Sequence, residues 1–157
     1  MKTIVLYATK HGAAEEIARR IAGKIAGAVI HDLKQSLPSL TDFDCIIIGS
    51  SLYAGMIRKE AKFFLSKNTN LLQEKKLGLF LCGMDTNGEK AHFDSNFSAD
   101  ILQKAKAISF LGGIFDPKKA GIFERLIFKV VTKQNVYTNT INDSKIEQFA
   151  ESMRAPD

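Results

Sequence analysis

The sequence predicts an α/β fold in which a doubly wound, five-stranded parallel sheet lies between two layers of helices. Apolar runs of strand length alternate along the chain with longer stretches whose apolar residues recur at helical spacing. The strand runs are apolar almost throughout, which is typical of parallel strands covered on both faces. Because no repeat or linker-like stretch interrupts this order, residues 1–157 are expected to form one domain.

Five apolar runs are expected to form the strands. They are rich in residues that favour strands, and glycine or polar residues bound them. The first run, "TIVLYA", has no charged residue, so burial of both its faces is expected. The predicted strands are Thr3–Ala8, Ala28–Leu33, Asp44–Ser51, Lys76–Met84 and Ile108–Phe115.

Helices are expected between these strands. After the first strand, Ile17, Ile21 and Ile25 recur every four residues, and acidic residues precede basic ones, as the helix dipole favours. Gly27 is expected to end this helix. Further helices are predicted at Arg58–Lys67, at Ser98–Ala107 with Ser98 as N-cap, and at Asn142–Met153, whereas "DTNGEKAHFDSN" is predicted to be a polar loop.

Composition narrows the class of protein. Apolar residues make up 45% and charged residues 25%, as in soluble globular proteins. Cys45 and Cys82 lie in separate apolar runs, which argues against a disulfide framework or a zinc site and for reduced thiols in the cytoplasm. The histidines form no metal-ligand set with them, and neither a signal peptide nor a membrane-spanning helix is expected from the apolar runs. The net charge of +5 is too small to indicate nucleic-acid binding.

Three glycine-containing loops follow the carboxyl ends of predicted strands. They are "TKHGAA" after the first strand, "SSLYAG" after the third and "CGMDTNG" after the fourth. In doubly wound sheets, ligands bind outside these strand ends. Tyr53 and Met84 place a flat and a sulfur-bearing side chain there, so a planar ligand is expected between the loops.

The turn "TKHGAA" leads directly into a helix N-terminus, which favours an anion. Thr9 adds a hydroxyl, and Gly12 allows close approach to the backbone. The turn matches neither G-x-G-x-x-G nor G-x-x-x-x-G-K-[ST], so a dinucleotide fingerprint and a P-loop are absent. Taken alone, the turn is either a compact site for one terminal phosphate or an ordinary strand-to-helix connection.

The segments "YATKHGAAEEIA", "IIIGSSLYAG" and "LFLCGMDTNG", in this order and spacing, resemble the flavodoxin-like family of FMN-binding proteins. The family's phosphate loop follows T/S-x-T-G-x-T at the place of Thr9–Ala14. The chain is most similar to the bacterial flavodoxin-type menaquinone-dependent protoporphyrinogen IX dehydrogenases, whose late Y/F-x-R-[FL]-[MI]-x-K stretch is echoed by "FERLIFKVV". The resemblance implies the strand order 2-1-3-4-5 and FMN as cofactor.

The resemblance also implies which residues contact FMN. The first loop would enclose the phosphate, the second would flank the isoalloxazine ring, and the third would border its other side. These residues are Thr9, Lys10, His11, Gly12, Ala13 and Ala14 for the phosphate, Ser51, Leu52, Tyr53, Ala54 and Gly55 along the ring, and Gly83, Met84, Asp85 and Asn87 on its other side.

Two positions of the phosphate turn depart from the family pattern. His11 and Ala14 stand where the family usually has hydroxyl residues. Since a hydrogen bond to a charged group contributes about 1.5–3 kcal/mol, weaker FMN binding than in a typical member is expected. Charge from Lys10, or from His11 when protonated, would partly compensate.

The segment Asp116–Lys133 is basic and amphipathic, with apolar residues on one helical face. A helix of this kind either buries that face against the sheet, which is the preferred interpretation, or lies on an anionic membrane surface. The apolar face comprises Phe123, Leu126, Ile127, Val130 and Val131; the basic residues are Lys118, Lys119, Arg125, Lys129 and Lys133.

The main functional hypothesis is an FMN-dependent oxidoreductase, cytoplasmic or peripheral at the inner face of the membrane. It would pass electrons or hydride through the flavin, with a porphyrinogen or a quinone among its redox partners, and it would touch the membrane through Phe123, Leu126, Ile127 and Val130. No catalytic side chain is assigned, because the chemistry belongs to the cofactor. The alternatives are an interaction or sensor module with weak or lost FMN binding, and a simple electron carrier, which the basic charge disfavours.

Overall fold

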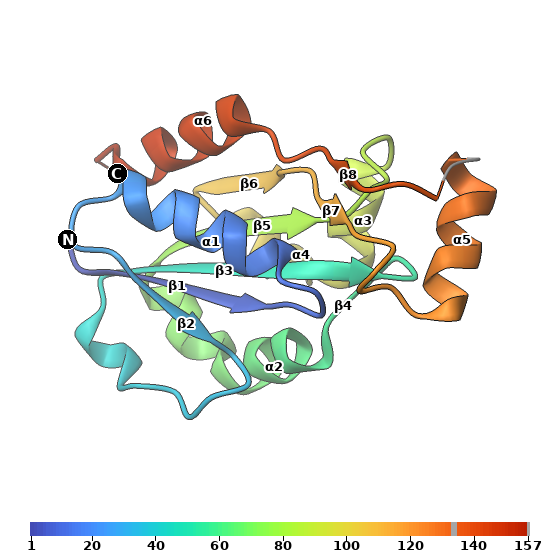
Figure 1. The fold of residues 1–157 in the computed structure, drawn as a ribbon. Helices are drawn as coiled ribbons and strands as arrows, with labels where there is room; N and C mark the ends of the chain where they lie inside the picture. The colour runs from blue at the N-terminus through green and yellow to red at the C-terminus, as the bar shows by residue number, and fades with distance from the viewer. Residues whose placement is uncertain (133–134, 157) are drawn as a thin grey trace.

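The computed structural model describes residues 1–132 and 135–156. Its main sheet has the order β2-β1-β3-β5-β6, which is the predicted order 2-1-3-4-5 of the five main strands (Figure 1). All neighbours along this path are parallel, and Thr3–Ala8 pairs in register with Cys45–Ser50. The strands are β1 (Thr3–Ala8), β2 (Val29–Asp32), β3 (Cys45–Tyr53), β5 (Lys76–Cys82) and β6 (Ala107–Phe110).

Helices cover both faces of this sheet, which gives the three predicted layers. Figure 1 shows α1 and α6 together on one face and α2 and α4 on the other. Successive β1 side chains alternate between the two cores: Ile4 and Leu6 face the α2 side, whereas Val5 and Tyr7 face the α1 side. The helices are α1 (Ala13–Lys24), α2 (Lys59–Glu74), α3 (Glu89–Asn96), α4 (Ala99–Lys104) and α6 (Asp143–Arg154), with a short 3-10 turn η1 (Leu40–Asp42).

Two predicted helix starts are confirmed by their caps. The Ser98 side chain accepts a hydrogen bond from the Ile101 N–H, and the Asn142 side chain accepts one from the Lys145 N–H. The prediction of a polar loop after β5 is wrong, because α3 forms within it. Since Phe93 is the buried residue of α3, the segment has little helical periodicity to detect.

The prediction of one strand from Ile108 to Phe115 is also wrong. The chain leaves β6 at Gly112, whose φ of 82° favours glycine. A Cβ at Gly112 would lie 1.9 Å from the Thr140 carbonyl oxygen, so only glycine fits this close approach. Two residues then form β7 (Ile114–Phe115), which pairs with β8 (Thr138–Asn139) in a separate antiparallel ribbon.

Helix α5 (Ile122–Thr132) lies beyond the carboxyl ends of the strands rather than on a face of the sheet (Figure 1). The prediction that its apolar face is buried against the sheet is therefore wrong. Phe123 is 76% exposed and Val130 is 72% exposed, and Leu126 and Ile127 are also more than half exposed. The helix is anchored instead by Phe128, which is 7% exposed. The Val131 side chain and Lys133 lie outside the described residues.

Candidate functional site

The turn after β1 is a short strand-to-helix connection built around Gly12. Its φ of 95° is left-handed, which favours glycine, and it stands at the N-cap of α1. Thr9 Oγ1 accepts a hydrogen bond from the Gly12 N–H at 2.9 Å, so the threonine hydroxyl braces the turn. The first N–H groups of a helix have no acceptor within it, and with the helix dipole they favour an anion at this turn.

The loop after β3 is a two-residue hairpin that leads into β4 (Met56–Ile57). Ala54 and Gly55 both have positive φ, 49° and 75°, as such tight hairpins require. The Asn96 side chain at the end of α3 donates to the Gly55 carbonyl and accepts from the Ile57 N–H, both at 2.9 Å. These bonds fix the hairpin beside the turn after β1, where Lys10 Nζ lies 4.4 Å from the centre of the Tyr53 ring.

The loops after β5 and β6 touch each other backbone to backbone. The Gly83 N–H donates to the Gly112 carbonyl at 3.1 Å. A Cβ at Gly113 would lie 2.8 Å from the Gly83 carbonyl oxygen, so glycine at Gly113 permits this contact. Asp85 Oδ1 accepts from the Asn87 N–H at 3.1 Å, which turns the rest of the loop away toward α3.

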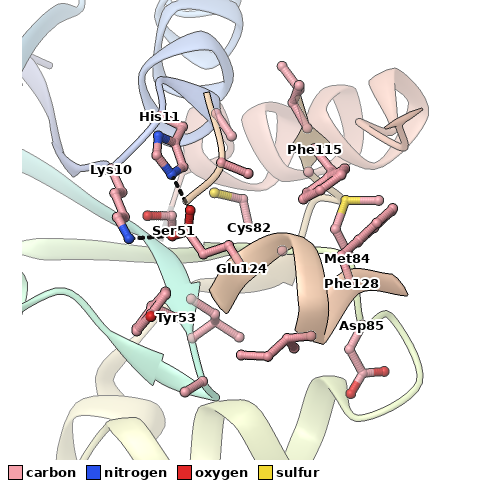
Figure 2. Close-up of a pocket in the computed structure, with 18 of the residues that line it drawn as sticks. Lys10, His11, Ser51, Tyr53, Cys82, Met84, Asp85, Phe115, Glu124 and Phe128 are labelled. Carbon is pink, nitrogen blue, oxygen red and sulfur yellow. Dashed lines mark hydrogen bonds and ion pairs between the residues drawn. The ribbon is translucent and has the colours of Figure 1, made fainter. Parts of the chain in front are cut away.

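Helix α5 closes the open side between these loops. Phe128 stacks on Phe115 with ring centres 3.6 Å apart and planes 12° apart. Ala120 completes this small apolar cluster, and Met84 packs against it. Figure 2 shows Met84, Phe115 and Phe128 gathered at one end of the pocket, with Lys10 and His11 at the other. The pocket thus has one aromatic end and one basic end.

Glu124 connects α5 to the basic end. Its carboxylate pairs with Lys10 Nζ through one oxygen and lies 2.9 Å from His11 Nε2 through the other, as the dashed lines of Figure 2 show. The second oxygen also accepts from the Gly121 N–H at 2.9 Å. Burial alone would raise the pKa of Glu124, but the hydrogen bonds from Lys10, Gly121 and His11 outweigh it and lower the pKa to about 2. Glu124 is therefore ionised at neutral pH.

The three sequence-predicted loops come together around a pocket of about 310 Å³. This volume lies within the range of small-molecule sites in proteins. Gly12 lies in an adjoining groove instead, Ala14 is fully buried in the first turn of α1, and Asn87 does not reach the pocket. The predicted residues that line it are Thr9, Lys10, His11, Ala13, Ser51, Leu52, Tyr53, Ala54, Gly55, Gly83, Met84 and Asp85.

Sequence reasoning missed the wall formed by the β6–β7 connection and α5. The Gly112–Gly113 pair inside a predicted strand was the available signal, since adjacent glycines indicate a break. No comparable signal marks the pairing of Glu124 with Lys10 and His11, because these two partners lie more than a hundred residues away in the sequence. The missed lining residues are Gly113, Ile114, Phe115, Asp116, Ala120, Glu124, Ile127 and Phe128, together with His92.

Cys82 and His92 lie in the pocket wall without forming a reactive pair. Burial raises the pKa of the Cys82 thiol to about 12, so it stays protonated at neutral pH and behaves as a small apolar side chain. His92 belongs to α3, where its ring stacks on Phe110 at 5.8 Å, rather than to the polar loop predicted for it. Among residues 1–132 and 135–156, no cluster of histidine, cysteine or acidic side chains could hold a metal ion.

Ser51 provides a test of whether this pocket fits a polar ligand. Its Oγ is buried and has no hydrogen-bond partner among the described residues. A buried hydroxyl without a partner is unfavourable, and such groups are rare in folded proteins. Because Ser51 lines the pocket, a ligand with a polar edge there would satisfy it, while the basic turn would receive an anionic end. The residues present therefore fit a planar ligand that carries a terminal phosphate.

Comparison with protein families gives an assignment for most of the chain. A family model described as "Flavodoxin domain" matches residues 4–141. No curated protein matches the chain in sequence.

Solved structures of low sequence identity share the fold. Oxidised flavodoxin 1 from Bacillus cereus superposes with a TM-score of 0.62 at 18% identity, over 98% of this chain and 97% of that one. A flavoprotein in complex with FMN from Lactobacillus acidophilus gives 0.51 at 17% identity, over 71% of this chain and 90% of the other. Rubredoxin oxygen:oxidoreductase from Desulfovibrio gigas gives 0.63 at 16% identity, and this chain spans only 35% of its length.

Proposed function

Because this chain belongs to the flavodoxin domain family, we propose that it binds FMN in the pocket between the strand-end loops and α5 and acts as an oxidoreductase. The single observation that carries the proposal is the buried, unpartnered Ser51 hydroxyl in a pocket whose opposite ends are aromatic and basic. Flat ring systems favour the first end and phosphates the second.

The residues of this chain would position the flavin rather than react with it. Thr9 and Gly12 shape the turn for the phosphate, with N–H groups at the start of α1 directed to an anion. The Tyr53 hairpin and the Gly83–Asp85 loop border the ring, and α5 keeps water from the Phe115 end. The bound flavin supplies the capacity to accept and release electrons or hydride.

The proposal is tested by titrating freshly purified protein with FMN and following the quenching of flavin fluorescence. Ser51→Ala removes the unpartnered hydroxyl, so we expect FMN affinity to fall about tenfold while the free energy of unfolding stays the same or rises slightly. Ser66→Ala on the exposed side of α2 is the matched control and leaves both quantities unchanged. Equal FMN affinity in Ser51→Ala and the wild type would show that the Ser51 hydroxyl does not contribute to FMN binding, which would contradict the proposal.

We propose further that the redox partners include a quinone or a porphyrinogen. The support is the sequence resemblance to menaquinone-dependent protoporphyrinogen IX dehydrogenases, which includes the stretch "FERLIFKVV" of α5. Protoporphyrinogen oxidation by flavin-loaded protein, with and without a menaquinone, checks this partner choice. Turnover that does not depend on the quinone would contradict it.

We propose that the protein is located in the cytoplasm and binds peripherally to the inner face of the membrane. The surface of α5 supports this proposal. No described helix is long and apolar enough to cross a bilayer. The exposed side of α5 instead presents Phe123, Leu126 and Val130, with Ile122 83% exposed beside them. Exposed basic residues, among them Lys118, Lys119 and Lys129, accompany this apolar face. Apolar side chains beside basic ones fit an anionic lipid surface.

Sedimentation with phosphatidylglycerol-containing vesicles tests this contact. The wild type is expected to sediment with the vesicles at low salt and not with neutral phosphatidylcholine vesicles. Phe123→Glu should abolish sedimentation, since each large apolar side chain contributes about 1.5–3 kcal/mol when removed from water. Phe63→Glu is the matched control, because Phe63 is 66% exposed but lies on α2. A wild type that stays in the supernatant at low salt would contradict the membrane contact.

The alternative of a module with weak FMN binding also has one observation in its favour. The side chains of Lys10 and His11, the basic groups of the phosphate turn, are already paired with Glu124. If the titration shows FMN affinity too low for the protein to retain flavin during purification, the interaction or sensor role becomes the better interpretation.

A further inference from the structure

The basic end of the pocket carries its own anion. Lys10 and His11 are the cationic or protonatable side chains of the turn predicted to hold the phosphate, and both contact the Glu124 carboxylate. The side chain of Glu124 is 13% exposed, whereas those of Lys10 and His11 are 38% and 35% exposed, so water screens this ion pair only in part. A negatively charged group on α5 therefore faces the place proposed for a negatively charged group of the ligand.

We propose that Glu124 sets how strongly the pocket prefers FMN over riboflavin, because its carboxylate competes with the flavin phosphate for Lys10 and His11. This inference rests on the proposed function and names the residue that determines phosphate selectivity at the same site. The two flavins share the isoalloxazine ring and differ in the terminal phosphate, so contacts of Tyr53 or Met84 with the ring act on both alike.

The competition follows from the number of charges at the turn. One carboxylate already pairs with both side chains. A phosphate must therefore either draw them away, which leaves the carboxylate unpaired, or bind without the two side chains. Asp116, a second acidic residue, also lines this pocket, which makes an added dianion less favourable still. Each outcome weakens binding of the phosphate while leaving binding of the ring unaffected.

Glu124 also has a structural role, which the choice of substitution must preserve. Gly121 precedes the first helical residue of α5, and its N–H donates to the Glu124 side chain, as in the return bond of a capping box. Glutamine can accept the same hydrogen bond, so Glu124→Gln removes the charge without removing the cap. The substitution thereby keeps the cap of α5 while it removes the charge that competes with the phosphate.

The experiment measures dissociation constants of FMN and riboflavin for the wild type and Glu124→Gln. We expect the ratio of riboflavin to FMN dissociation constants to rise about tenfold in Glu124→Gln, because one competing charge-assisted interaction is removed. Riboflavin affinity should stay within about twofold of the wild type. Glu147→Gln is the matched control: Glu147 is likewise bonded to two basic side chains, Lys24 and Arg154, but lies on α6 away from the pocket. The ratio of riboflavin to FMN dissociation constants in Glu147→Gln should equal that of the wild type.

A second measurement uses the wild type alone and does not depend on the folding of a variant. FMN, but not riboflavin, should shift the NMR resonance of the Gly121 amide, whose hydrogen bond to Glu124 changes when the phosphate displaces the carboxylate. Binding of both flavins with an unchanged ratio in Glu124→Gln, or identical Gly121 shifts for both, would overturn the inference and leave the proposed function standing. If neither FMN nor riboflavin bound to any of the proteins, both the inference and the proposed function would be overturned.

Discussion

Two residues of the turn after β1 take their partners from a distant part of the chain. Thr9 braces Gly12 within the turn, but Lys10 and His11 reach across to Glu124 on α5. The residues of the turn itself were predictable from the glycine and the helix start, whereas the ion pair was not. A sequence pattern reports local geometry well, but pairing between residues separated by more than a hundred positions depends on the folded chain.

The lowered pKa of Glu124 predicts a pH dependence of stability. Its pKa is about 2 in the folded protein against an ordinary 4.5, so the unfolded chain binds the proton more tightly. The stabilisation is therefore complete above the unfolded value of about 4.5 and is lost as the pH falls toward 2. In urea unfolding, Glu124→Gln should be less stable than the wild type by on the order of 2 kcal/mol at neutral pH, and this difference should shrink through that range.

Urea unfolding of Glu147→Gln over the same pH range provides a comparison at an exposed ion pair. The pKa of Glu147 is lowered chiefly by the hydrogen bond from Lys24, but solvent screens this surface pair. If the difference in free energy of unfolding between the wild type and Glu124→Gln stayed constant from neutral pH down to the folded-state pKa of about 2, the carboxylate charge would not stabilise the attachment of α5.

At the scale of elements, the strands were predictable and the irregular segments were not. Runs such as "TIVLYA" carry their own signal, because a strand buried on both faces excludes polar residues over its whole length. Helix α3 has one fully buried residue, Phe93, and so shows little periodicity. The amphipathic face of α5 is predictable from the sequence, but the prediction that this face is buried is wrong, since hydrophobic spacing does not say what the face contacts.

The attachment of α5 depends on one aromatic pair. Phe128→Ala removes the ring that stacks on Phe115, and a small cluster with few other members cannot compensate. We expect amide hydrogen exchange in α5 to accelerate by roughly 100-fold while β1 and β3 keep their protection, since local opening is independent of the main core.

The control for this prediction is Phe63→Ala, which truncates an exposed ring on α2 and should leave the exchange of α5 unchanged. Accelerated exchange throughout β1 and β3 in Phe128→Ala would show instead that α5 is part of the cooperative core.

At the scale of the whole molecule, the sheet order and the two helical layers place the loops that follow β1, β3, β5 and β6 at one edge. This arrangement requires close packing across the central strands. Gly49 of β3 lies against the buried ring of Phe80, and a Cβ there would come within 1.8 Å of Phe80 Cζ. The strand therefore depends on glycine at this position for packing rather than for backbone freedom.

Gly49→Ala is expected to destabilise the whole fold by about 1–3 kcal/mol or more, because overpacking at a rigid position forces the ring or the backbone to move. Urea unfolding measures the change. Gly23→Ala on α1, where a Cβ would meet no atom within 4 Å, should leave stability unchanged or raise it by about 0.5–1 kcal/mol. Equal stability of Gly49→Ala and the wild type would contradict the packing described for β3 and β5.

The central claim is that the edge formed by these loops and α5 is a flavin site. The visible absorption spectrum of freshly purified protein, recorded before and after addition of FMN and removal of unbound flavin, tests it most directly. Flavin absorption bands that stay with the protein after removal of free FMN, and that decrease in Ser51→Ala, are the expected result. A protein that remains colourless after incubation with FMN, with no quenching of flavin fluorescence, would contradict the claim.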